Sequence, residues 1–214
     1  MELNKDIPNI IYLPEECRSI LLEHCRRKLN EIYLSDEPRE KKAFGIIAGN
    51  KTAKGILVRR CFPLRRNVRS QEPYKDYIDK VMEKHAIPSE TPLCKRGWVA
   101  DPGELQDVLV ECHRDNITLV GSYHMHRVAW KDDQDRDTPT HLDGVLGAQS
   151  RMIMFIIAMV KPDQPVMRAF YEGKLHAEFS IVSVPSIPPP QIDINGEPFT
   201  IQKQKNIHEH KHGT

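Results

Sequence analysis

The sequence predicts one domain of the α/β (α+β) class, built around a single mixed β-sheet, and three observations support this. Segments with helical spacing and segments with strand spacing of apolar residues interleave along the chain. The length of 214 residues, with 39% hydrophobic residues, suffices for one full core but is short for two typical domains. The longest apolar run, residues 152–160, is far shorter than the ~20 residues of a membrane span.

The N-terminal part combines strands with one helix. A short strand is expected at residues 9–13, and Pro14 then opens a helix whose apolar side chains recur at helical spacing. Two further strands are expected at residues 43–49 and Gly55–Pro63, separated by a polar turn with a glycine at each end.

Residues 65–96 interrupt this pattern. The stretch is charged, contains three prolines and has one plausible helix, at Tyr74–His85. We interpret it as an excursion from the domain and as a candidate recognition surface. Another helix begins after it, with Asp101 suited to the N-cap and Pro102 to the first helical position.

The second half of the chain adds most of the expected sheet. Strands are expected at residues 117–126, 152–160, 166–172 and 176–184, with a short helix at residues 140–150. A proline-rich and polar segment follows, so the domain is assigned to residues 1–184 and a tail to residues 185–214. The alternating histidines near the end of this tail are assigned no site.

Composition excludes some classes of function. Lys plus Arg total 31 against 30 for Asp plus Glu, so no global field favours nucleic acid or an anionic membrane. The N-terminus has no basic stretch leading into an apolar segment, and a cytoplasmic location is expected. The 5 cysteines are scattered without a Cys-x-x-Cys spacing, which predicts reduced, mostly packed thiols.

Two short motifs carry the candidate chemistry, and each also has an ordinary interpretation. In His124-Met125-His126 the histidines are two apart on an expected strand, so both imidazoles point to one face and Met125 to the other. A histidine pair of this kind also occurs in ordinary polar roles. Thr140-His141-Leu142-Asp143 equally matches the capping box at a helix start.

The two motifs together favour a zinc site. Two histidines and one carboxylate leave the fourth tetrahedral position of Zn²⁺ open for water, which is the arrangement of catalytic rather than structural sites. Zinc lowers the pKa of such a water to about 7, so a hydroxide nucleophile exists at neutral pH. His124, His126 and Asp143 are therefore the predicted zinc ligands, and hydrolysis is the predicted reaction.

The order of these motifs resembles the JAMM motif of the MPN-domain zinc metalloproteases, in which an upstream Glu precedes His-x-His-Pro and Ser-x-x-Asp. Residues 43–49 are similar to an early strand of that family, residues 99–105 to the start of its second helix, and residues 168–170 to a late strand. The likeness is to prokaryotic, JAB-like members with a divergent motif. It implies a curved mixed sheet flanked by helices. It also implies a protein or peptide substrate, such as a ubiquitin-like or small sulfur-carrier protein, cut at a peptide or isopeptide bond.

The resemblance further implies a catalytic Glu three residues before the first glycine of the early strand, where this chain has Lys42. Glu40 would share the face of Lys42 on an extended strand but stand about 6.6 Å further along. A bulge could bring Glu40 into register as the general base. Equally, Glu40 could belong to a solvated run of charges.

Three milder departures from the family motif remain. Thr140 stands in place of Ser and keeps the hydroxyl that helps bind an oxyanion, whereas Met125 and Arg127 replace the usual Ser or Thr and Pro. Residues 127–139 form a longer, polar connector that could act as a lid.

The sequence leaves three functions open. The first is a zinc-dependent peptidase or isopeptidase that uses Thr140 and, as base, Glu40. The second is a catalytically weak or silent MPN module that binds metal and acts as an interaction scaffold, which Lys42 favours. The third is a domain without metal. The substrate, the substrate-binding residues and the oligomeric state cannot be read from the sequence.

Overall fold

A computed structural model describes residues 8–89 and 91–186 of the chain. Its strands are β1 (Ile10–Pro14), β2 (Phe44–Thr52), β3 (Gly55–Pro63), β4 (Thr118–His126), β5 (Ile153–Ala158), β6 (Val166–Tyr171) and β7 (Glu178–Val184). Its helices are α1 (Glu15–Leu29), α2 (Tyr74–His85), a 3-10 helix at Leu93–Lys95, α3 (Pro102–Arg114) and α4 (His141–Gly147). Nearly all of the expected polar tail, including its histidines, lies outside the described residues.

The elements follow the order expected from the sequence, and α4 differs most in length. It was expected to reach residue 150 but ends at Gly147, after which Ala148 is extended. A Cβ on Gly147 would lie 2.7 Å from the carbonyl oxygen of Glu172, so the backbone after β6 packs directly on the end of this helix. Tertiary packing therefore sets the end of α4.

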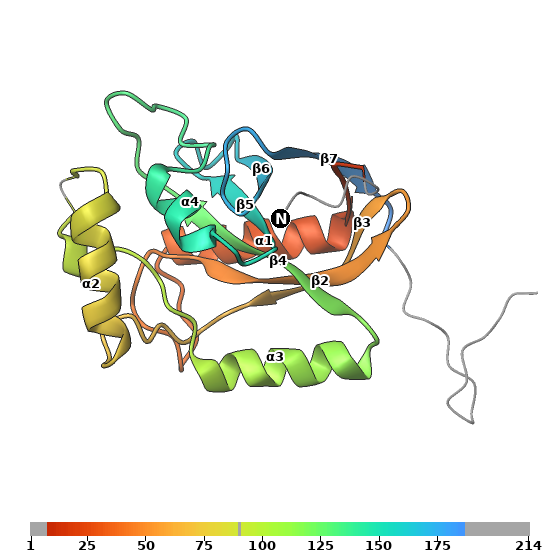
Figure 1. Cartoon of the computed structure of the whole chain (residues 1–214), viewed down its shortest axis with the longest axis horizontal. Helices are drawn as coiled ribbons and strands as arrows, with labels where there is room; N and C mark the ends of the chain where they lie inside the picture. Colours follow the sequence, from red (N-terminus) through yellow and green to blue (C-terminus); the bar gives the residue numbers. More distant parts are fainter. Residues whose placement is uncertain (1–7, 90, 187–214) are drawn as a thin grey trace, which may run out of the picture.

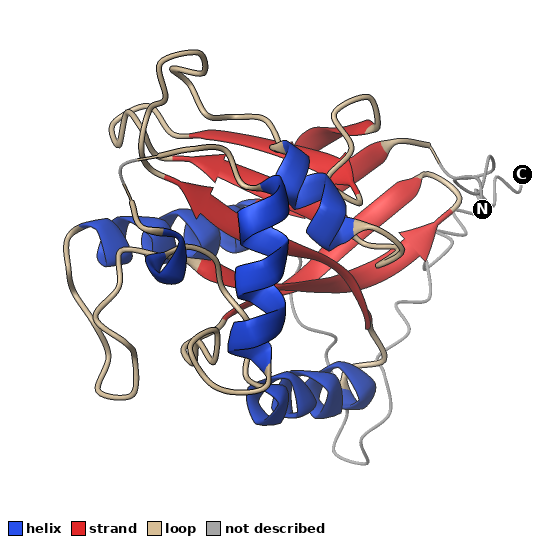
Figure 2. Cartoon of the chain, turned by 60° about the vertical axis from the view of Figure 1, so that its left-hand side comes forward, coloured by secondary structure: helices blue, strands red, loops and turns tan. Residues whose placement is uncertain are grey.

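The seven strands form a closed barrel in the order β1-β3-β2-β4-β5-β6-β7. A curved mixed sheet was expected, and the parallel pairing of β1 with both β3 and β7 closes it into a barrel. The mixed α/β class agrees with the prediction. No sequence signal, however, indicated that β1 would pair with β7. Figure 2 shows the helices distributed around these strands.

β2 is buried on both faces, which explains its unbroken apolar run. Ile47 packs into the main core, together with Leu21 of α1 and Tyr123 of β4. Ile46 packs into a second cluster that includes Val108 of α3. α1 and α3 thus cover opposite sides of this part of the sheet, as Figure 1 shows.

The excursion at residues 65–96 is tied into the domain by one buried arginine. Arg69 is 2% exposed, and its Nη2 donates to Asp79 of α2 at 2.5 Å and to the carbonyl of Leu93 at 3.1 Å. Its Nε donates to the carbonyl of Arg96 at 2.8 Å. Because a buried guanidinium is costly unless its donors are paired, these contacts hold α2 and the segment after it in one arrangement.

The thiols are free, as the sequence predicted. Cys94 is exposed and the other four are buried. Cys17 and Cys25 lie on one face of α1 and pack in the main core, where they fill space as small apolar groups. Within residues 8–89 and 91–186, the helices are too short or too polar to traverse a bilayer.

Candidate metal centre

The two histidines of β4 point the same way and nearly touch. β4 is paired with β2 on one side and β5 on the other, so its backbone is fixed along its length. Alternation along the strand puts His124 and His126 on one face, where their Nε2 atoms lie 3.0 Å apart. Two nitrogen lone pairs at this distance repel each other unless a proton or a cation lies between them.

The orientation of His126 leaves its Nε2 available as a ligand. Its Nδ1 lies 2.8 Å from the carbonyl oxygen of Arg136, which can only accept, so Nδ1 carries the hydrogen. Burial, and then the neighbouring His124, lower the pKa of His126 to about 3. At neutral pH the ring is therefore uncharged, with the lone pair of Nε2 directed at the cluster, as metal-binding histidines require.

Asp143 completes the cluster from the start of α4. Its Oδ2 accepts hydrogen bonds from the backbone N–H and the hydroxyl of Thr140, both at 2.7 Å, and its Oδ1 lies 3.4 Å from His124 Nε2. Burial alone would raise the pKa of Asp143, but the adjacent His124, His126 and the Thr140 N–H hold it well below its usual range. The carboxylate is therefore charged at neutral pH. Asp143 can take part in the capping box and still act as a ligand, because Oδ2 accepts from Thr140 while Oδ1 faces His124.

The spacing of these atoms fits a small divalent ion. One ligand atom from each of His124, His126 and Asp143 lies within 4.8 Å of the others, and separations of 3.0 and 3.4 Å occur. A tetrahedral zinc ion with bonds of about 2.0–2.1 Å holds its ligands roughly 3.3 Å apart. Two imidazoles and one carboxylate therefore form a possible metal site, and the donor set suits zinc.

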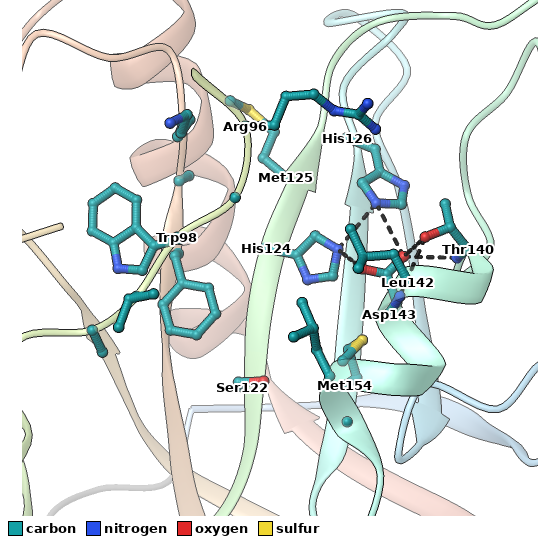
Figure 3. A pocket seen from close by; sticks show the side chains of 18 of the residues that line it. Arg96, Trp98, Ser122, His124, Met125, His126, Thr140, Leu142, Asp143 and Met154 are labelled. Atoms are coloured by element: carbon teal, nitrogen blue, oxygen red, sulfur yellow. Dashed lines mark hydrogen bonds and ion pairs between the residues drawn. The ribbon is translucent and has the colours of Figure 1, made fainter. Parts of the chain in front are cut away.

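The cluster forms part of the wall of a cavity of about 550 Å³. Figure 3 shows Thr140, Leu142 and Asp143 facing the imidazoles of β4, with Trp98 on the other side. Side chains of the excursion, including Ile78 and Met82 of α2, also line this space. The volume lies within the usual range for ligand pockets, about 300–1,000 Å³. The excursion and the metal cluster, distant in sequence, thus share one cavity.

Lys42 rather than Glu40 faces the cluster. The register that pairs Phe44 with His124 continues through the hydrogen bond from Met125 N to the Ala43 carbonyl at 3.0 Å. Continued one residue further, this register would place Lys42 opposite His126, and Lys42 lines the cavity.

Glu40 has other partners. Its Oε2 lies 3.0 Å from Lys42 Nζ and accepts a hydrogen bond from Asn67 at 3.0 Å. The irregularities in the pairing of β2 lie between Ile47 and Gly49. This part of β2 is farther from residue 40 than Phe44, which pairs with His124. The strand pairing of β2 begins at Phe44 and so does not extend to residue 40; a bulge there and a role for Glu40 as base stay predictions.

Thr140 lines the cavity beside Asp143, and its hydroxyl is engaged. It donates to Asp143 Oδ2 at 2.7 Å, so stabilising an oxyanion would require the hydroxyl to rotate. The connector at residues 127–139 lies against the site, since Arg127, Trp130 and Arg136 all line the cavity. A lid function for this connector stays a prediction.

Sequence reasoning missed three supporting residues. Arg136 orients His126 through its backbone carbonyl, and Arg96 reaches the cavity from the excursion. Gly173, in the turn between β6 and β7, has a φ of +65°, and a Cβ there would lie 2.7 Å from the Asp143 carbonyl oxygen. The only sequence signal for any of them is the glycine itself, which is typical of a turn or a close backbone approach.

We expect Gly173→Ala to displace Asp143, because the new methyl group collides with its carbonyl and the left-handed backbone disfavours alanine. Zinc affinity should fall about 10- to 100-fold, the usual effect of disturbing a ligand's support. Zinc titration against a competing chelator measures this. Gly55→Ala is the matched control, since Gly55 also has positive φ and a close neighbour but lies in the β2–β3 turn. An equal loss in both variants would contradict the positioning role.

Comparison with known proteins supports the fold. No protein-family model matches the chain, and no curated protein matches it. Among solved structures, it is similar to the solution structure of protein DSY2949 from Desulfitobacterium hafniense, with a TM-score of 0.56 and 18% sequence identity. The match covers 83% of this chain and 95% of that one. At this identity the likeness shows the mixed α/β fold alone.

Proposed function

We propose that this chain is a metal-dependent hydrolase, with zinc as the preferred ion, that cleaves a peptide or isopeptide bond. The observation that carries the proposal is the convergence of His124, His126 and Asp143 on the wall of a cavity. Structural zinc sites close the fourth position with another side chain, and the described residues supply no fourth His, Cys, Asp or Glu here. When bound, zinc would polarise a scissile carbonyl and activate a water molecule as the nucleophile.

The chain's own residues would prepare the site for this reaction. The carbonyl of Arg136 keeps His126 in one tautomer, and Thr140 orients the carboxylate of Asp143. Phe44 and Trp98 stack with ring centroids 6.0 Å apart on the cavity wall. Their apolar surface could hold an extended peptide against the cluster and exclude water.

The sequence resemblance to the JAMM/MPN metalloproteases supports the class of bond. In that family the same order of histidines and aspartate serves hydrolysis of peptide and isopeptide bonds. A protein substrate, such as a ubiquitin-like or sulfur-carrier protein, is therefore part of the proposal.

A second candidate is a catalytically weak or silent module that binds metal and serves as a scaffold. The observation in its favour is that Lys42 faces the cluster and pairs with Glu40, so the expected base position holds a cation. Lacking a general base costs about 10²–10⁴-fold in rate, while zinc binding is unaffected.

The test uses protein purified without chelator and a panel of ubiquitin-like and sulfur-carrier proteins, both as linear fusions and as isopeptide conjugates. Elemental analysis gives the metal content, and gel analysis follows cleavage with and without a chelator. We expect chelator-sensitive cleavage that zinc restores and magnesium does not, because a site with two imidazoles suits zinc better. Zinc without any cleavage supports the scaffold, and protein that neither contains nor takes up zinc contradicts both candidates.

A further inference from the structure

The cavity wall is strongly basic although the whole chain is nearly neutral. The basic side chains that line it are Lys41, Lys42, Lys95, Arg96, Arg127 and Arg136. Its acidic side chains in the described part of the chain are Asp143 and Glu172. Asp143 belongs to the metal cluster, and Glu172 already pairs with Lys174 at 2.7 Å. Lys41, Lys42 and Arg136 pair with Glu31, Glu40 and Asp133, so in the described part of the chain the positive charge left for an entering anion comes from Lys95, Arg96 and Arg127.

Arg136 has a donor that the described chain does not satisfy. The residue is 5% exposed, its guanidinium carbon lies 3.4 Å from the centroid of the Trp130 ring, and Nη1 pairs with Asp133 at 3.1 Å. Its Nε is fully buried and has no hydrogen-bond partner in residues 8–89 and 91–186. Buried donors are nearly always paired, and the Nε of Arg136 lacks such a partner in the described residues.

Arg96 adds a second guanidinium in the same cavity. One of its nitrogens, Nη1, donates to the carbonyl of Ile87 at 2.8 Å, and no carboxylate pairs with Arg96 within the described ranges. Its backbone is held by Arg69. Burial, and then the nearby charge of Arg136, lower the pKa of Arg96. Both guanidinium groups line the cavity; Arg136 also pairs with Asp133, whereas Arg96 has no carboxylate partner in the described ranges.

We infer that Arg96 and Arg136 bind a carboxylate of the substrate beside the metal ligands. The planar fork of a guanidinium pairs with a carboxylate through two parallel hydrogen bonds, and holding the fork in advance reduces the entropy lost on binding. Both arginines line the cavity that holds the metal ligands, and the backbone carbonyl of Arg136 lies 2.8 Å from His126 Nδ1. The inference rests on the proposed hydrolase and names its substrate class: a peptide with an acidic side chain or a free C-terminus near the scissile bond.

The test measures binding to metal-free protein, so that a carboxylate cannot bind zinc instead. Three capped pentapeptides are compared: one with a central Glu and an amidated C-terminus, one with Gln and a free C-terminus, and one with Gln and an amide. Trp98 and Trp130 are the 2 tryptophans of the chain and both line the cavity, so their fluorescence reports binding. We expect at least one acidic peptide to bind about 10-fold or more tighter than the neutral peptide. The preferred acid identifies the source of the carboxylate.

Variants assign the preference to the arginines. Arg96→Ala should abolish it, and Arg96→Lys should keep only part, because the charge remains and the fork is lost. Arg114→Ala, on the exposed side of α3, is the matched control and should keep it in full. Arg136→Gln is a further variant. If it fails to fold, the two variants Arg96→Ala and Arg96→Lys still test the inference.

Equal binding of all three peptides, or an acid preference that survives in Arg96→Ala, overturns the inference. The outcome is separate from that of the hydrolase test. Carboxylate binding without cleavage of any substrate would keep the arginines as a carboxylate-binding site but reject the hydrolase and, with it, the assignment of that carboxylate to a substrate. Cleavage without a carboxylate preference would support the hydrolase and reject the carboxylate site.

Discussion

Replacing His126 by alanine is expected to lower the zinc content of the purified protein from about one ion per chain to near zero. His126 is one of only three candidate ligands in the cluster, and the remaining pair, His124 and Asp143, cannot hold zinc tightly. Disturbing a residue that merely supports a ligand already costs 10–100-fold in metal affinity, so loss of a ligand should exceed about 100-fold. Elemental analysis and zinc titration measure the effect.

His141→Ala is the matched control for this variant. His141 precedes Asp143 by two residues on the same helix, but its Nε2 lies 3.0 Å from His85 Nδ1, away from the cluster. The control should retain zinc, and its unfolding temperature should still fall when a chelator is added, because an ion that binds only the folded state stabilises it. Full zinc content in His126→Ala would contradict the assigned site.

Lys42→Glu should raise the rate of cleavage by about 10²-fold or more, the usual contribution of a positioned general base. The register of β2 against β4 brings residue 42 opposite His126, and the side chain lines the cavity. A carboxylate there would reach the region of the cluster that the Glu40 carboxylate, paired with Asn67, does not. The comparison of kcat/KM between wild type and variant measures this on any substrate that the panel reveals.

Lys41→Glu makes the same change of charge one residue earlier and serves as the control. Lys41 also lines the cavity, but its Nζ pairs with Glu31 and the register does not bring it opposite a metal ligand. The control should not gain activity, whereas a gain in both variants would indicate a general effect of charge. A Lys42→Glu protein that holds zinc and cleaves no substrate in the panel would reject the hydrolase and favour the interaction module.

The local parts of the candidate site could be predicted from the sequence because they depend on short-range geometry. The two-residue period of a strand places His124 and His126 on one face whatever the rest of the fold does. The four residues from Thr140 to Asp143 form a capping box, which is a local motif as well. Each motif was ambiguous alone; the structure forms the capping box and also brings the carboxylate within 3.4 Å of an imidazole nitrogen, so the two motifs together make a possible metal site.

Which residue occupies the position of the general base could not be predicted from the sequence. Placing Glu40 near the metal required a bulge before Gly45, and strand irregularities depend on how neighbouring strands pair rather than on local preference. In the structure, the irregular pairing of β2 lies between Ile47 and Gly49, and the register, continued two residues before Phe44, would place Lys42 opposite His126. The pair of arginines was equally hidden, because Arg96 and Arg136 lie on separate loops without a repeating pattern.

The sequence by itself determined the mixed α/β class, the order of strands and helices and the residues able to bind a metal, because periodicity and capping act within a few residues. Only the tertiary structure decided that β1 joins β7 to close the barrel, that Asp143 meets the histidines and that the excursion lines their cavity. These features join segments that lie far apart along the chain. Their free energy comes from burial and pairing between whole elements, which no short stretch of sequence records.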